Sequence, residues 1–146
     1  MDSNSGSTVM ETIYGDLQRE LGRQPIKKCE APDGPLAYCH PGAEHPLLIF
    51  FHSTPMGAIL RIDAPVAAKA DWSSPGLSEL LLREQSDWLF GRAERSGEGV
   101  VIEHCLRADS PPDQLASVVI GLADTALHLR YDLARMGGLT ILEEAA

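Results

Sequence analysis

The chain has 146 residues, of which 44% are hydrophobic and 23% are charged. This length is typical of one domain, so a two-domain enzyme is nearly excluded, and the hydrophobic content excludes wholesale disorder. Lys and Arg total 12 against 21 Asp and Glu, which gives a formal net charge of −9. That sign opposes binding to nucleic-acid phosphates or to anionic membranes, so we expect no direct nucleic-acid partner and no membrane partner.

The cysteines and the apolar runs indicate where the protein works. Cys29, Cys39 and Cys105 are an odd number of cysteines without regular spacing, as is typical of reduced thiols. The N-terminal residues show no basic region followed by an apolar one, so no signal peptide is predicted. The longest apolar run, residues 47–51, is far shorter than the ~20 residues of a membrane span. We expect a cytoplasmic protein, and the bias toward Ala, Gly, Leu and Arg indicates a bacterial one.

The first predicted element is an amphipathic helix. Apolar residues recur at helical spacing over 9–21, with Ser7 as the candidate N-cap and Gly22 as the stop. Residues 1–6 are predicted to be flexible. Pro and Gly then interrupt β-branched and aromatic residues at short intervals, which predicts short extended segments near 26–31, 35–40, 46–53 and 57–64. The third segment is apolar on both faces, which predicts a strand covered on both sides.

The second half of the chain alternates helix, hairpin and helix. Ser74 and Pro75 supply an N-cap and a first-turn proline for a helix predicted over 75–90. Two extended runs around a turn at 96–99 predict a β-hairpin. A long amphipathic helix follows from about residue 112 until Gly137 and Gly138 end it, and residues 139–146 are predicted to be a flexible tail.

These elements predict the fold class. The order is α-β-β-β-α-β-β-α, which indicates a single α+β domain over residues 1–146 with three helices. The links between strands are too short for parallel crossovers, so we expect an antiparallel sheet of about five strands.

The sequence matches no known metal-binding or enzyme motif. Zinc binds cysteine and histidine side chains, and one region contains Cys29, Cys39, His40, His45 and His52. Their spacing, however, matches no paired-ligand motif. The sequence contains no nucleophile elbow, phosphate-binding loop, dinucleotide fingerprint or zinc-protease motif. We therefore expect no metal, no cofactor and no catalytic residue.

Apolar residues of the second predicted helix are the candidate interface. Trp88 lies near its end beside Leu89 and Phe90, and tryptophan is over-represented as an interface anchor, although core packing is its more ordinary role. The interface hypothesis assigns the contact with a second copy or a partner to Leu77, Leu80, Leu81 and Trp88.

A family resemblance rests on residues 77–137. This segment has a leucine-rich helix with Trp88 near its end, a hairpin over 91–94 and 100–104, an acidic turn at 108–110 and a long helix opening at 112–115. It resembles the class I type III secretion chaperones and, equally, the YbjN-like proteins that share their fold. The rest of the chain resembles them only in its order of elements, and the Pro-rich stretch 31–46 departs from the pattern.

The resemblance implies a homodimer whose subunits meet through the second helix and neighbouring strands, with grooves that hold an extended segment of another protein. We therefore predict a non-enzymatic, dimeric, chaperone-like protein. Its acidity predicts a basic client, such as a nucleic-acid-binding protein, and a secreted effector is the other client implied. The alternatives are a pure oligomerisation module and a small ligand-binding or hydrolytic domain that uses His52, His104 or Asp63.

Overall fold

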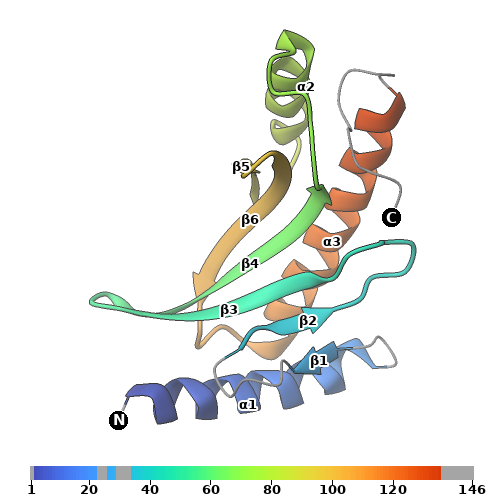
Figure 1. Ribbon diagram of the computed structural model, residues 1–146. Helices are drawn as coiled ribbons and strands as arrows, with labels where there is room; N and C mark the ends of the chain where they lie inside the picture. Colours follow the sequence, from blue (N-terminus) through green and yellow to red (C-terminus); the bar gives the residue numbers. More distant parts are fainter. Residues whose placement is uncertain (1, 23–25, 29–33, 136–146) are drawn as a thin grey trace.

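The computed structural model describes residues 2–22, 26–28 and 34–135 (Figure 1). In these residues three helices accompany an antiparallel sheet of six strands, which confirms the α+β class; the sheet has one strand more than expected, because all four extended segments predicted before residue 64 pair in it. The elements are α1 (Asp2–Leu21), β1 (Ile26–Lys28), β2 (Leu36–Tyr38), β3 (Leu47–Thr54), β4 (Gly57–Ala67), α2 (Pro75–Gln85), β5 (Arg92–Ser96), β6 (Gly99–Arg107) and α3 (Pro112–Arg135).

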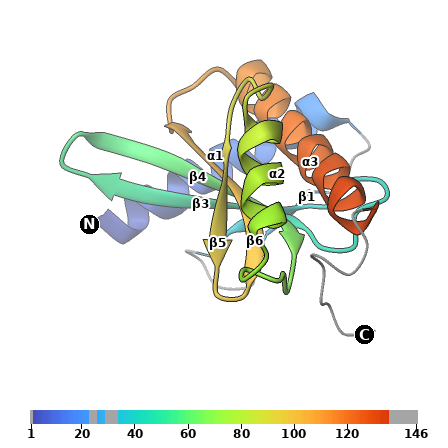
Figure 2. The same cartoon turned by 90° about the horizontal axis from the view of Figure 1, so that it is seen from above.

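The strands lie in the order β1-β2-β3-β4-β6-β5. The chain leaves β4, forms α2, and returns through β5 to place β6 beside β4, so β5 is left at the edge of the sheet. The β3–β4 hairpin turns at Pro55 and Met56 and extends beyond the other strands (Figure 2).

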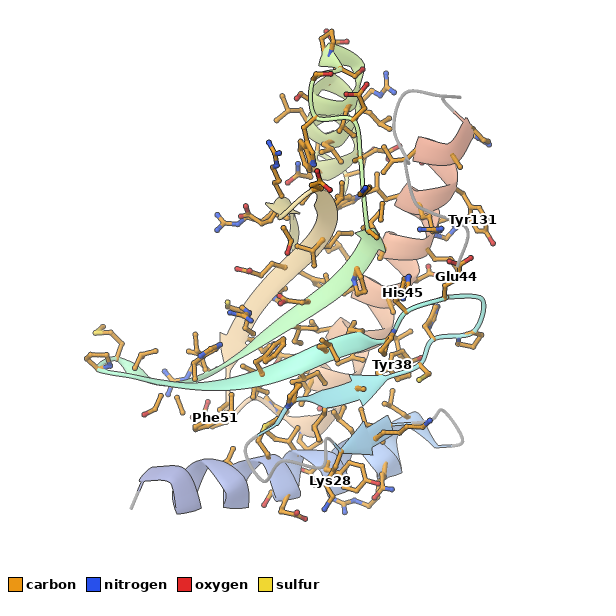
Figure 3. The ribbon with its side chains drawn as sticks, in the orientation of Figure 1. Lys28, Tyr38, Glu44, His45, Phe51 and Tyr131 are labelled. Carbon is orange, nitrogen blue, oxygen red and sulfur yellow. The ribbon has the colours of Figure 1, made fainter. Side chains whose placement is uncertain are left out.

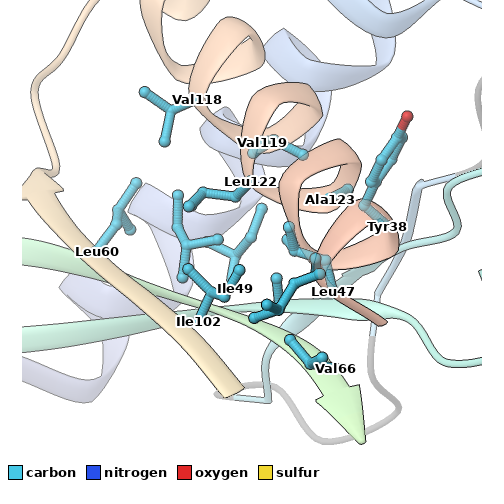
Figure 4. Close-up of a cluster of buried hydrophobic side chains, with 14 of the residues drawn as sticks. Tyr38, Leu47, Ile49, Leu60, Val66, Ile102, Val118, Val119, Leu122 and Ala123 are labelled. Atoms are coloured by element: carbon cyan, nitrogen blue, oxygen red, sulfur yellow. The ribbon is translucent and has the colours of Figure 1, made fainter. Parts of the chain in front are cut away.

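One face of the sheet carries the core. Alternate residues of each strand point to this face, as the pleat requires, and α1 and α3 pack on it. Figure 4 shows Val119 and Leu122 of α3 against Ile49 and Ile102 of the sheet. Each such residue contributes about 1.5–3 kcal/mol when its side chain is fully buried. None of the described helices is long and apolar enough to cross a membrane.

The prediction that the third extended segment is covered on both sides is wrong. Leu47 and Ile49 of β3 are buried in the core, whereas Leu48 and Phe50 on the other face are only half-buried. Among the described residues no helix covers them; the Arg61 guanidinium instead lies over the Phe50 ring, 4.5 Å from its centroid. A long side chain of the neighbouring strand thus shields the apolar group without a second layer.

Two helix boundaries also differ from expectation. Helix α1 begins at Asp2, five residues before the candidate N-cap Ser7; once packing has nucleated a helix, each further residue adds one hydrogen bond at low cost. Helix α2 ends at Gln85 and not near residue 90, because Ser86 turns its backbone N–H and its hydroxyl to the Arg83 carbonyl. The predicted tail, 139–146, lies outside the described residues.

Candidate interaction surface

The side of the sheet away from α1 and α3 is called the open face here. It carries the side chains that alternate with the core residues of β3, β4, β5 and β6. The strand register sets its pattern: Arg92, Glu103, Asp63 and Leu48 follow one another across four strands, and Cys105, Arg61 and Phe50 form the next row. The side chains of the open face are Leu48, Phe50, His52, Ile59, Arg61, Asp63, Pro65, Arg92, Glu94, Val101, Glu103, Cys105 and Arg107.

An ion pair lies at the centre of the open face. Arg61 Nε is 3.3 Å from Asp63 Oδ2, and Glu103 stands opposite Asp63 on β6. Burial raises the pKa of the Asp63 carboxyl above its ordinary value, and the charge of Arg61 lowers it in part. Burial likewise raises the pKa of the Cys105 thiol, so this cysteine stays protonated at neutral pH and is a poor nucleophile.

Two polar atoms on this face, His52 Nε2 and Asp63 Oδ1, are buried without a hydrogen-bond partner, and Arg61 Nε has only its contact with Asp63 Oδ2. Buried polar atoms in folded proteins are paired in the great majority of cases, and leaving one unpaired costs about 1–3 kcal/mol.

A shallow depression of about 410 Å³ lies where the open face meets β5. Val101 forms its apolar floor, and three arginines and three carboxylates surround it: Arg61, Arg92, Arg95, Asp63, Glu94 and Glu103. These charges balance, whereas the chain as a whole carries −9. Contact with another protein at this place therefore avoids the general repulsion that the rest of the surface exerts on acidic molecules.

Strand β5 lies at one edge of the sheet and, among the described strands, pairs with β6 only. Because Ser96 and Gly99 flank a two-residue turn, Glu94 and Arg92 direct their backbone groups to β6, and Ala93 and Arg95 direct theirs outward. The Gln85 side chain of α2 accepts a hydrogen bond from the Ala93 N–H at 3.0 Å. One side-chain amide therefore covers part of an edge that an added strand could otherwise occupy.

The predicted interface leucines lie in the core of the subunit itself. Leu77, Leu80 and Leu81 are 0%, 3% and 7% exposed, and Trp88, half-buried, follows the end of α2. The large apolar residues that this region exposes are Leu82 and Leu89, at 72% and 93%. The apolar side of α2 is thus buried against the sheet and α3, and a contact with a second copy would use the opposite side of α2.

The three residues of the enzymatic alternative do not converge. His52 and Asp63 share the open face, but His104 points to the core face, where its ring lies 5.5 Å from that of Phe90. No group of three or more His, Cys, Asp and Glu in the described ranges could hold a metal ion. Sequence reasoning missed Arg61, which lies at the centre of the open face. Its alternation with the core residues of its strand is the signal that could have identified it.

His104 is expected to make the stability of the fold depend on pH. Its Nδ1 accepts a hydrogen bond from the Gly91 N–H at 3.0 Å, and burial lowers its pKa below the ordinary 6.5. The unfolded chain therefore takes up this proton at a higher pH than the folded chain does. The contribution of neutral His104 is complete above about pH 6.5 and is lost as the pH falls through the lower pKa of the folded state.

We expect the urea midpoint to fall between about pH 7.5 and about pH 5.5, and to fall less in H104N, whose amide oxygen can still accept the Gly91 hydrogen bond without titrating. The exposed His45 offers the control H45N, which should behave like the unaltered chain. An equal decline in H104N and the unaltered chain would assign the pH dependence to other groups.

The comparisons with known proteins add no family assignment. No protein-family model matches the chain, and a search of curated proteins gives no match.

Proposed function

We propose that this protein is a non-enzymatic, dimeric, chaperone-like module that holds an extended or flexible segment of a partner protein. The observation that carries the proposal is the β5 edge, whose outward backbone groups adjoin a charge-balanced depression on the open face. An extended segment can add to such an edge through backbone hydrogen bonds, with alternate side chains reaching the open face. At Ala93 the added segment would replace the Gln85 side chain as the acceptor of the backbone N–H.

The charge of the chain favours a basic client. A net charge of −9 speeds encounter with a basic segment at low salt. At physiological ionic strength the Debye length is ~8 Å, so attraction between charges further apart than this is screened and the rate advantage becomes smaller. The client class that fits is a basic protein, such as a nucleic-acid-binding protein, or a secreted effector. The dimer part of the proposal is supported by Leu82 and Leu89, two large apolar side chains exposed on and after α2.

A proline at position 93 tests the client site. A93P removes the outward N–H of the edge strand together with its hydrogen bond to Gln85, and the matched control A93V keeps that N–H and favours a strand. From a cytosolic extract treated with nuclease, the unaltered chain and A93V are expected to retain the same basic proteins, identified by mass spectrometry. A93P should lose them, and all three should retain less at high salt.

Retention of the same proteins by A93P would contradict the edge as the client site. Recovery of acidic proteins alone would contradict the electrostatic part of the proposal. Tight binding of the purified protein to DNA would contradict the chaperone-like function as a whole.

A further inference from the structure

The sheet has a step in its edge where β5 ends. Strand β4 pairs with β6 from Val100 to Arg107, whereas β5 pairs with β6 only from Gly99 to Glu103. Figure 1 shows β6 running on past the short β5. Residues 104–107 of β6 therefore have a paired strand on one side only within the described ranges, over about 13 Å at ~3.3 Å per residue. These residues are called the β6 step here.

The backbone of Cys105 points to the unpaired side of the step. Odd-numbered residues of β6 bond to β5, because the hairpin turn has two residues, and even-numbered residues bond to β4. The Ala108 N–H continues the even series, since it donates to the Ala58 carbonyl at 3.0 Å. Within the described part of the chain nothing pairs with the N–H and C=O of Cys105. The Arg107 N–H points the same way, but the Arg107 carbonyl accepts from the Ser110 N–H at 3.1 Å.

A shallow depression of about 320 Å³ lies at the step, lined by Gly91, Arg92, Glu103, His104 and Cys105. The chain itself closes one end of it. Arg92 pairs with Glu103, and the Gly91 N–H donates to His104 Nδ1 at 3.0 Å, so the chain leaves the sheet at this point. A segment from the middle of a polypeptide would have to pass through these residues, whereas a chain end can stop in front of them. The step therefore fits a terminus.

The charges at the closed end favour a cation. Arg92 forms an ion pair with Glu94, and Arg61 forms one with Asp63. The half-buried Glu103 has no ion pair among the described residues, and it stands opposite the second carboxylate, that of Asp63, on β4. An ammonium group at the closed end would be attracted by Glu103, whereas a carboxylate would be repelled.

We propose that the β6 step binds the free N-terminus of a partner polypeptide, whose first residues add to β6 in the parallel direction. In a parallel pair, the N–H and C=O of one residue bond to the residues before and after the one opposite it. The Cys105 N–H then donates to the carbonyl of the partner's first residue, and the Cys105 carbonyl accepts from the N–H of its third. The Arg107 N–H donates to the carbonyl of that third residue, and the α-ammonium lies beside Glu103.

The two sides of β6 determine which partner side chains fit. The second residue of the partner lies opposite Cys105 on the open face, and the first and third lie on the side of His104 and Leu106. The first residue is small, because the His104 ring occupies its side. The half-buried Leu106 continues a row with Leu60 and Phe51, which Figure 3 shows at this end of the sheet, so an apolar third residue extends that row.

Amide NMR of the full chain with a short peptide tests the proposal. The probe is Ala-Ser-Val-Ser with a C-terminal amide, whose only charge is the α-ammonium. We expect the peptide to shift the amide resonances of Cys105 and Arg107 and to slow their exchange with solvent. N-acetylation of the peptide should weaken binding about tenfold, because a hydrogen bond to a charged group is stronger than one between neutral groups.

Two variants locate the charge that matters. E103Q should bind the free and the acetylated peptide equally weakly. The control E98Q removes an exposed carboxylate from the same hairpin, outside the step, and should bind as the unaltered chain does. This control separates a local effect of Glu103 from an effect of net charge.

Equal affinities of the free and the acetylated peptide would overturn the proposal. Tighter binding of an acetylated peptide with a free C-terminal carboxylate would also overturn it, in favour of the other chain end. Unchanged Cys105 and Arg107 resonances at millimolar peptide would overturn the site itself, as would shifts confined to Ala93 and Arg95. The client site at the β5 edge is tested separately by A93P, so either proposal can fail without the other.

Discussion

Replacing Leu81 by aspartate is expected to abolish the folded subunit. Leu81 is 7% exposed and belongs to the core that α2 shares with the sheet and α3. Burying an unpaired carboxylate costs several kcal/mol, which is comparable with the whole free energy of unfolding of a small domain, about 5–15 kcal/mol. We expect L81D to show no cooperative urea transition by circular dichroism and to aggregate.

The adjacent residue provides the control. Leu82 is 72% exposed, so L82D is expected to change the free energy of unfolding by no more than about 0.5 kcal/mol. Light scattering of L82D beside the unaltered chain then tests the proposed dimer. A dimer mass for the unaltered chain with a monomer mass for L82D would place the outer side of α2 in the contact, and a dimer mass for both would remove it from the contact. A folded L81D with an unaltered midpoint would return Leu81 to the interface hypothesis.

Replacing Gly91 by alanine is expected to lower the free energy of unfolding by about 2–5 kcal/mol. Gly91 has a φ of 88°, a left-handed conformation that costs other residues about 1–2 kcal/mol. A Cβ atom there would lie 2.6 Å from Leu122 Cδ2 and 2.9 Å from Ile102 Cγ2, inside the core. Overpacking of this kind adds about 1–3 kcal/mol, because both neighbours are fully buried.

Gly97 separates the backbone part from the packing part. It has a φ of 61°, but a Cβ atom there would meet no atom within 4 Å. G97A should therefore cost only the backbone strain, about 1–2 kcal/mol. Urea unfolding measures the loss of free energy in both variants. The slope of the unfolding free energy against urea concentration should stay unchanged, so that a shifted midpoint reports stability alone. Equal losses in G91A and G97A would show that Leu122 and Ile102 yield to the added methyl group.

Local patterns in the sequence determined much of this fold. Apolar residues at steps of three and four predict α3, because a helix repeats every 3.6 residues. This period can be recognised without information about the elements that pack against the helix. Period-two alternation predicts which side of β6 carries Ile102 and which carries Glu103, and the short turn at Gly97 predicts the hairpin. The net charge, which is independent of folding, sets the expectation of a basic client.

Tertiary structure alone decided what covers each apolar residue. Helical spacing already groups Leu81, and not Leu82, with Leu77 and Leu80, but only the packing of α2 decides that this stripe is buried in the chain's own core and not against a second copy. The register between β4 and β6 places Asp63 and His104 on opposite faces, and it assembles the open face around Arg61. Such pairings join residues about 40 positions apart in the chain, so no local period encodes them; they follow from the one register that buries the core side of every strand.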